Sequence, residues 1–444
     1  MGRQTVYETI KREANALNGE LCAMRRDFHK YAETGWFEVR TSSILARKLS
    51  EMGYEVLVGA DVCKKESRMG VPDEETLQAQ YERALAQGAD PEFAKKMKGG
   101  MTGVIAILRC GAGPVVGMRF DIDALGVFES DSDEHLPARE GFASVNPGFM
   151  HACGHDGHAS IGFGVARVLM DLKDELHGTI KLIFQPAEEG VRGAKAIVDN
   201  GHLDDVDFFL GSHVTDEAIA GDGSAIYPGC HGSLATTKYD VIFRGQAAHA
   251  GGEPHAGKNA LLAACAAVTN LYGIPRHGEG ASRINVGTLH AGSGRNVVAD
   301  EAKMELEVRG ETTAINDYMS EYAKRVIEGA ALMHGVSCEI RLMGAASSMQ
   351  SSAALMQRVR RVCTDDLHIR VADQDSMHAG GSEDVAYMVN RVQERGGQAT
   401  FLRLLTSETT GHHSRNFDYG EKVLPLGVEV FCGVVYDILG GEKR

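Results

Sequence analysis

The sequence predicts an α/β protein in which a main domain, with a largely parallel sheet and flanking helices, is interrupted by a smaller inserted domain. Three observations predict this fold. At 444 residues the chain is too long for one ordinary core. Short β-branched runs alternate with helix-like stretches in the first half and again near the end, which is typical of buried parallel strands. Between them the pattern changes to β-α-β-β-α-β, the order of a ferredoxin-like domain.

The N-terminal part predicts helices rather than strands. Apolar residues recur at helical spacing within 44–52, and Gly53 supplies a stop signal, so two helices are expected up to this point. The highly charged segment 61–98 also favours helix. Pro72 opens it and Asp90-Pro91 divides it into two helices. We expect this segment to be a surface excursion without chemistry of its own.

The later elements follow from the period of their apolar residues. Buried strands are expected at 103–108, 115–120 and 179–184, with a helix over 158–173. The inserted domain is expected to contain strands at 236–245, 282–292, 303–310 and 337–343 and helices at 259–272 and 315–333. The predicted boundaries are 1–232 for the first part of the main domain, 233–344 for the inserted domain, and 345–444 for the second part.

The composition excludes several classes of partner. A formal net charge of −15 repels nucleic acid and anionic membrane surfaces, so neither is expected as a partner. An anionic small molecule would need local positive charge from metal ions or arginine. The chain shows no apolar stretch of about 18 residues and no leader-like start. Its nine cysteines are odd in number and scattered, as expected for reduced thiols in the cytoplasm.

The densest cluster of chemistry-bearing residues lies at 151–158. It contains His151, Cys153, His155, Asp156 and His158. Thiolate and imidazole are ligands that divalent transition metals prefer, and a carboxylate can orient a ligating imidazole. The alternatives are a polar helix start and a cysteine nucleophile with a histidine base. Five potential ligands together favour a metal site, in which the thiolate would be occupied.

A second cluster, Glu188-Glu189, directly follows the strand 179–184. Sites in α/β proteins are built at such strand ends. Adjacent side chains of an extended backbone point in different directions. One carboxylate could therefore bind metal while the other acts as a general base. The alternative is a solvated pair in a turn.

Further candidates also stand at strand ends. Asp121 and Asp123 would lie on one face of an extended chain, where they either orient ligands or cap a turn. His213 follows the apolar run 206–211, and His412 and His413 lie near the C-terminus. A lone histidine is more often structural than a ligand, so these gain weight only beside the two clusters above.

The combination of motifs resembles the M20 metallopeptidase/amidohydrolase family, in the branch of bacterial N-acyl-amino-acid hydrolases and plant auxin-conjugate hydrolases. The matching motifs run the length of the chain: RRDFHKYAETGW (25–36), DIDAL (121–125), HACGHDGHAS (151–160), QPAEEG (185–190), RGQAAHAG (244–251), GSGRNVV (292–298), GSEDVA (381–386) and HHSRNFD (412–418). The segments 67–84, LATTK and RLMGAA point within this branch to hydrolases of p-aminobenzoyl-glutamate.

The resemblance implies a role for each matching residue. The implied metal ligands are Cys153, which bridges two ions, and His155, Glu189, His213 and His413.

Glu188 matches the general base and Asp123 the aspartate of the family's H-x-D motif, whereas Asp121 stands where that motif has histidine. The inserted domain is implied to be a lid and dimerisation domain. On it, His249 would stabilise the oxyanion, and Asn296 and Arg309 would face the substrate.

The implied activity is amide hydrolysis by two divalent cations in a small carboxylate-bearing substrate, either p-aminobenzoyl-glutamate or a similar N-acyl amino acid. The alternatives are indole-3-acetyl-aspartate or another N-acyl amino acid as substrate, and a non-catalytic binding subunit of a hydrolase complex. Ligand softness favours zinc and the resemblance favours manganese, which we expect. The resemblance also implies a homodimer, or a heterodimer with a homologous subunit.

Overall fold

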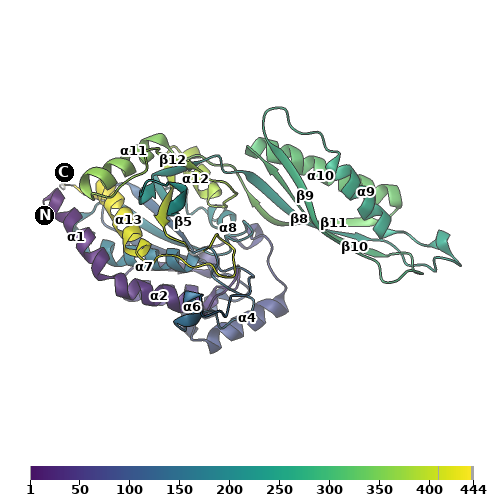
Figure 1. Cartoon of the computed structure of the whole chain (residues 1–444), viewed down its shortest axis with the longest axis horizontal. Coiled ribbons are helices and arrows are strands. Elements are labelled where there is room, and N and C mark those ends of the chain that lie inside the picture. Colours follow the sequence, from purple (N-terminus) through teal and green to yellow (C-terminus); the bar gives the residue numbers. More distant parts are fainter. Residues whose placement is uncertain (1, 409, 442–444) are drawn as a thin grey trace. The chain divides into compact units, whose positions relative to one another are not determined.

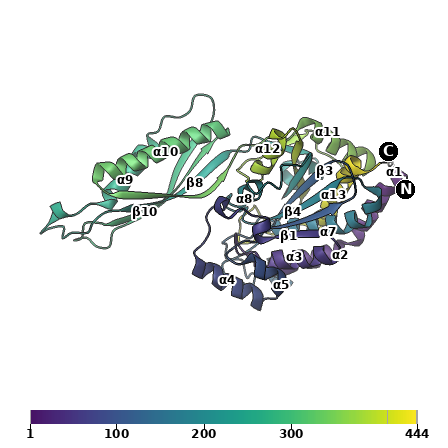
Figure 2. The same ribbon diagram turned by 180° about the vertical axis from the view of Figure 1, so that it is seen from behind.

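The computed structural model describes residues 2–408 and 410–441, and these form two compact units (Figures 1 and 2). The larger unit contains the chain up to 231, residues 349–379 and the chain from 384 onward. The smaller unit contains residues 232–348 together with 380–383. The sequence pattern placed the boundaries at 233 and 344, and it held no sign of the four-residue return at 380–383.

The larger unit contains a seven-stranded sheet in the order β1-β2-β4-β3-β5-β13-β6. Its strands are β1 (Glu55–Val58), β2 (Val104–Arg109), β3 (Val115–Asp121), β4 (Thr179–Gln185), β5 (Phe208–Asp216), β6 (Ile226–Tyr227) and β13 (Gln398–Thr406), and β7 (Gly229–His231) pairs separately with β12 (Ser376–His378). The central strands β4, β3, β5 and β13 are parallel, and β1, β2 and β6 run antiparallel to their neighbours. The prediction of an α/β fold with a largely parallel central sheet is confirmed.

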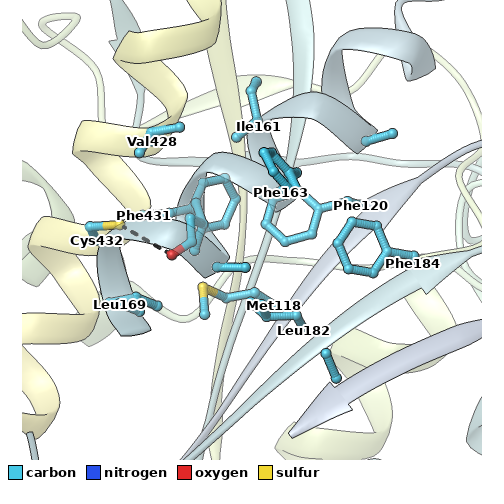
Figure 3. Packing of buried hydrophobic residues seen from close by; sticks show 14 of the residues in the cluster. Met118, Phe120, Ile161, Phe163, Leu169, Leu182, Phe184, Val428, Phe431 and Cys432 are labelled. Carbon is cyan, nitrogen blue, oxygen red and sulfur yellow. Dashed lines mark hydrogen bonds between the residues drawn. The ribbon is translucent and has the colours of Figure 1, made fainter. Parts of the chain in front are cut away.

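Helices cover both faces of this sheet. The helices of the larger unit are α1 (Arg3–Ala16), α2 (Asn18–Lys30), α3 (Val39–Glu51), α4 (Glu74–Ala86), α5 (Pro91–Ala94), α6 (Leu136–Arg139), α7 (His155–Asp171), α8 (Ala194–Val198), α11 (Ala353–Arg361), α12 (Ala386–Glu394) and α13 (Val423–Leu439). Helices α7 and α13 pack on one face, with α1 and α2 against them, while α8 and α12 lie on the other. Phe120 of β3 and Phe184 of β4 meet α7 and α13 side chains in the first of these layers (Figure 3).

The N-terminal region differs from its prediction in two ways. It forms three helices instead of two, because α1 ends at Ala16 and α2 begins at Asn18. The charged segment forms α4 and α5 as predicted, with Asp90 capping the N-terminus of α5. It is not merely a surface excursion, however: Tyr81, Phe93 and other side chains of the segment are buried in the core, where α4 and α5 pack against α3 (Figure 2).

The smaller unit has the predicted order of elements: β8 (Ala235–Arg244), α9 (Ala260–Tyr272), β9 (Ser282–Ala291), β10 (Glu301–Gly310), α10 (Thr313–His334) and β11 (Ser337–Ala346). Its four strands form an antiparallel sheet in the order β11-β8-β10-β9. Alternate residues of β8, including Tyr239, Val241 and Phe243, pack with α9 and α10 in a separate core. This is the ferredoxin-like arrangement.

Among the described residues, no helix combines the length and the apolar character needed to cross a bilayer.

Candidate metal centre

Five residues from four parts of the larger unit converge at the carboxyl ends of its parallel strands. Cys153 precedes α7, His155 is the first residue of α7, Glu189 follows β4, His213 lies in β5, and His413 lies on the loop before α13. The donor atoms fall into two groups, Cys153 with His155 and His213, and Cys153 with Glu189 and His413, each within 4.8 Å of one another. Cys153 belongs to both groups, as a ligand shared by two ions would. His213 lies inside β5 rather than at the strand end predicted for it.

Hydrogen bonds orient the two histidines for metal binding. His155 Nδ1 lies 2.9 Å from the carbonyl oxygen of Asp123, and His213 Nδ1 lies 2.6 Å from that of Val214. A carbonyl only accepts, so each Nδ1 carries a proton, and in the neutral ring each Nε2 carries a lone pair. The Nε2 of His213 lies 3.4 Å from Cys153 Sγ. Both rings therefore have the tautomer that ligates a metal.

The Glu pair does not stand in extended backbone, contrary to the prediction. Residues 188–190 form a turn between Ala187 and Val191, which have φ values of +52° and +61°. Consequently both carboxylates join one group with His155, instead of pointing in different directions. The side chain of Asp123 accepts a hydrogen bond from Glu189 N at 2.9 Å, which holds the turn against His155. Asp123 thus contacts both a candidate ligand, His155, and the backbone of the turn, so each of its two interpretations has a contact.

Burial raises the pKa values of two acidic groups in the cluster. Burial, reinforced by the charge of Glu189, raises the pKa of the Cys153 thiol well above its usual value. Burial also outweighs the attraction of His155 and raises the pKa of Glu189 to about 7. A divalent cation would favour the ionised form of both groups.

The donor atoms fit a pair of divalent cations. Among the described residues, His155 Nε2 and Glu189 Oε1 are buried without a hydrogen-bond partner, which is costly unless a ligand satisfies them. Ligands of one ion, each about 2.0–2.3 Å from it, lie within about 4.6 Å of each other. The donor atoms of each group lie within 4.8 Å of one another, which is close to that limit. Thiolate, imidazole and carboxylate together suit transition metals such as zinc or manganese.

Three other histidines of the predicted clusters belong to no complete ligand set with this cysteine. His151 is buried, and neither of its ring nitrogens has a hydrogen-bond partner among the described residues. His158 uses both ring nitrogens in hydrogen bonds to protein atoms. The Nε2 of His412 lies 3.1 Å from Glu408.

Three predicted site residues lie in the smaller unit, so their roles stay predictions. His249 forms an isolated β-bridge with Val297, and its Nδ1 accepts hydrogen bonds from two glycine N–H groups. Asn296 is exposed on the loop before β10. Arg309 lies in β10, and its guanidinium donates two hydrogen bonds to the carboxylate of Glu307, at 2.9 and 3.1 Å.

One buried network behind the cluster was not predicted from the sequence. Arg119 of β3 is fully buried, with Nη1 2.6 Å from Asp121 Oδ2 and Nε donating to Gln185 at 2.8 Å. Its Nη2 lies 3.6 Å from Asp384, which accepts hydrogen bonds from the N–H groups of residues 193 and 194. An arginine inside the apolar run 115–120 was the available signal, because a buried charge requires partners.

The chain is similar over most of its length to known hydrolases and to a peptidase of known structure. The chain is 46% identical over 426 residues to one of the subunits of p-aminobenzoyl-glutamate hydrolase from Escherichia coli (strain K12), covering 96% of this chain and 97% of the relative. It is 47% identical over 414 residues to indole-3-acetyl-aspartic acid hydrolase of Enterobacter agglomerans, covering 93% and 94%. A crystal structure of the YXEP protein of Bacillus subtilis, a dinuclear metal binding peptidase from the M20 family, superposes with a TM-score of 0.65 at 25% identity, covering 96% and 99%.

The model of peptidase family M20/M25/M40 matches residues 117–437, which is well over half of the chain and includes all five converging residues. The protein belongs to the M20/M25/M40 peptidase family and is a hydrolase of amide bonds.

Proposed function

We propose that the protein hydrolyses the amide bond of p-aminobenzoyl-glutamate or a similar N-acyl amino acid, using two divalent cations that share Cys153. The observation that carries the proposal is the convergence of Cys153, His155, Glu189, His213 and His413 beside Glu188. The relatives named above support the substrate class, because both names describe an acyl group joined to an acidic amino acid. Indole-3-acetyl-aspartate is the alternative substrate, and the second relative supports it.

Glu188 is the proposed general base and acid. Its carboxylate is buried and belongs to the same group as His155 and Glu189, so a water molecule at the centre would lie within its reach. Glu188 would take the proton of the attacking water and deliver it to the leaving nitrogen. Bound divalent cations would supply the charge that polarises the amide carbonyl and eases the ionisation of water. Asp123 would hold His155 and the Glu189 backbone in place.

The physiological metal is proposed to be manganese, with zinc as the alternative. Protein freed of metal with a chelator and reconstituted with each ion alone should regain more turnover with Mn²⁺ than with Zn²⁺. Greater turnover with Zn²⁺ at equal occupancy would reverse this assignment. We place the enzyme in the cytoplasm, in keeping with nine cysteines that are all free.

The smaller unit is proposed to act as a lid and to mediate dimerisation, with His249, Asn296 and Arg309 facing the substrate. Two features support an interface: β9 is an edge strand of its sheet, and α9 exposes Leu261 and Leu262. The partner is a second copy of this chain or a homologous subunit. Light scattering on the purified chain, by itself and mixed with such a subunit, measures which assembly forms.

Replacement of Glu188 by Gln is the decisive test of the chemistry. The variant keeps the shape of the side chain but cannot take a proton, so turnover of p-aminobenzoyl-glutamate should fall by about 10²-fold or more while the metal content stays unchanged. Glu189→Gln serves as the matched control, because loss of this proposed ligand should lower the metal content. Undiminished hydrolysis by Glu188→Gln would refute the assigned role.

A parallel assay on indole-3-acetyl-aspartate ranks the two substrates by kcat/KM. If pure, metal-loaded protein hydrolysed neither amide and activity appeared only on adding a homologous subunit, the alternative of a binding subunit would replace the proposal.

A further inference from the structure

Asp121 and His158 lie directly behind one half of the candidate metal centre. Asp121 is the last residue of β3, and His158 lies in the first turn of α7. Both side chains are buried. His158 Nδ1 donates to Asp121 Oδ1 at 2.5 Å, and His158 Nε2 accepts from Val214 N at 2.9 Å. With both nitrogens engaged, His158 has no lone pair left for a cation.

These contacts position the two histidines of one ligand group. Val214 follows His213 in β5, and its carbonyl oxygen accepts the Nδ1 proton of His213. The His158 ring packs against both neighbours, 4.8 Å from the ring of His213 and 5.3 Å from that of His155. Loss of the His158 ring would therefore free the backbone beside His213 and leave a cavity against both ligands.

Arg119 fixes Asp121 in turn. The guanidinium of Arg119 is 2.6 Å from Asp121 Oδ2, and neither side chain is exposed. The same Oδ2 atom lies 3.5 Å from His155 Nε2. Since Arg119 already neutralises this carboxylate, Asp121 is better suited to hold His158 than to serve as a ligand.

The other ligand group is built differently. Neither Asp121 nor His158 joins Glu189 and His413 in a group of donor atoms among the described residues. The side chain of His413 is 56% exposed on a loop. The Glu189 backbone is held by Asp123 instead. Asp121 and His158 thus position the ligands of only one of the two groups.

We infer that Asp121 and His158 are positioning residues that set the affinity of one cation, the ion held by Cys153, His155 and His213. They leave the affinity of the second cation, at Glu189 and His413, unchanged. The inference rests on the proposed two-cation site. It adds that the ligands of the two ions are positioned by different residues and to different degrees.

The test measures stepwise binding of Mn²⁺ and of Zn²⁺ to the full-length protein by competition with a chelating dye, together with metal content per chain after dialysis. In His158→Ala and Asp121→Asn, one of two binding steps should weaken by about 10–100-fold, while the other changes by less than about 2-fold. His158→Gln, whose amide can still accept from Val214 N, should weaken that step less than His158→Ala does.

Combining His158→Ala with His413→Ala, and separately with His213→Ala, identifies which ion is affected. In His413→Ala, where only the step at His155 and His213 remains, His158→Ala should weaken that remaining step. In His213→Ala, the binding step that His158 supports is already lost, so the same change should add little. A further 10-fold loss in the His213→Ala background would overturn the inference.

The matched control is Tyr54→Phe, which removes a buried hydrogen bond of 2.9 Å from Tyr54 to Ala166 O in the same helix, α7. Both binding steps should stay within about 2-fold of wild type in this variant. If His158→Ala weakened both steps equally, or neither, the positioning role would be refuted although the two-cation site would stand. A wild-type protein that bound fewer than two ions would refute the proposed function itself.

Discussion

Arg25 of α2 is a fully buried cation on which the N-terminal end of α7 depends. Its Nε lies 2.9 Å from Asp156 and its Nη2 2.6 Å from Asp418, and neither carboxylate is more than 2% exposed. A third contact, 3.3 Å to Glu421, is partly solvated. Replacement of Arg25 by Met keeps much of the side-chain volume but leaves Asp418 buried without this counter-ion and Asp156 with His29 as its remaining charged partner.

The expected cost follows from this burial. Removing one partner of a buried ion pair destabilises a protein by about 3–5 kcal/mol, because the remaining charge stays desolvated. Arg26, the next residue, provides the control. Its side chain is 34% exposed and pairs with Glu140 and Glu421, so Arg26→Met should cost no more than about 1 kcal/mol.

Trp36 supplies the assay. It is the one tryptophan of the sequence, it is fully buried, and it belongs to the same unit as Arg25. Its fluorescence therefore reports the unfolding of this unit in urea. With a denaturant slope of about 3 kcal/mol per molar, Arg25→Met should lower the midpoint by roughly 1 M or more, and Arg26→Met by far less. Equal shifts in the two variants would refute the argument from burial.

Three other perturbations have expected outcomes in the same assay. Burial acts to lower the pKa of His29, but hydrogen bonds to Asp156 and Glu129 outweigh it and raise the pKa to about 9. The stability from charged His29 is therefore complete below about pH 6.5 and lost as the pH rises through 9, so unfolding free energy should fall by about 3 kcal/mol over that range and His29→Gln should flatten the fall. Phe120→Ala should cost about 3–5 kcal/mol, because the ring is buried against Phe184 in the main core. A chelator should lower the midpoint of the metal-loaded enzyme, because cations that bind the folded centre stabilise it, and an unchanged midpoint would argue against such binding.

The strands of the smaller unit and the strands β2, β3 and β4 of the larger unit could be predicted from local sequence because their apolar patterns are local. In β8, alternate residues such as Tyr239, Val241 and Phe243 pack inward, which is the period of two that the sequence displays. The central strands β3 and β4 are buried on both faces, and they are covered by helices on both sides as such strands require. The candidate ligands were also visible, because cysteine and histidine residues cluster within 151–158 and paired glutamates follow the strand 179–184.

Contacts between segments that are distant in the chain could not be predicted from local sequence. The turn after Ala187 depends on Asp123, which is far from it in the chain, so the assumption of extended backbone at Glu188 and Glu189 failed. The charged segment 61–98 looked like surface because its polar residues outnumber its apolar ones. Its few large apolar residues, such as Tyr81, nevertheless bury against α3 and the rest of the core. No local sequence pattern indicates that β2 runs antiparallel to β4 or that Arg119 contacts Asp384.

The motif at 151–158 illustrates why a cluster of potential ligands overstates the ligand count. Of its five residues, only Cys153 and His155 join the donor groups that include the distant Glu189, His213 and His413. Asp156 is held by Arg25, and His158 connects Asp121 to β5. A metal site in a rigid protein needs ligands held from behind, and buried carboxylates and imidazoles provide this because each can form charged hydrogen bonds in fixed directions. The motif therefore combines the ligands with the groups that orient them. For this reason a substitution at Asp156 or His158 should perturb metal binding, although neither residue is assigned as a ligand.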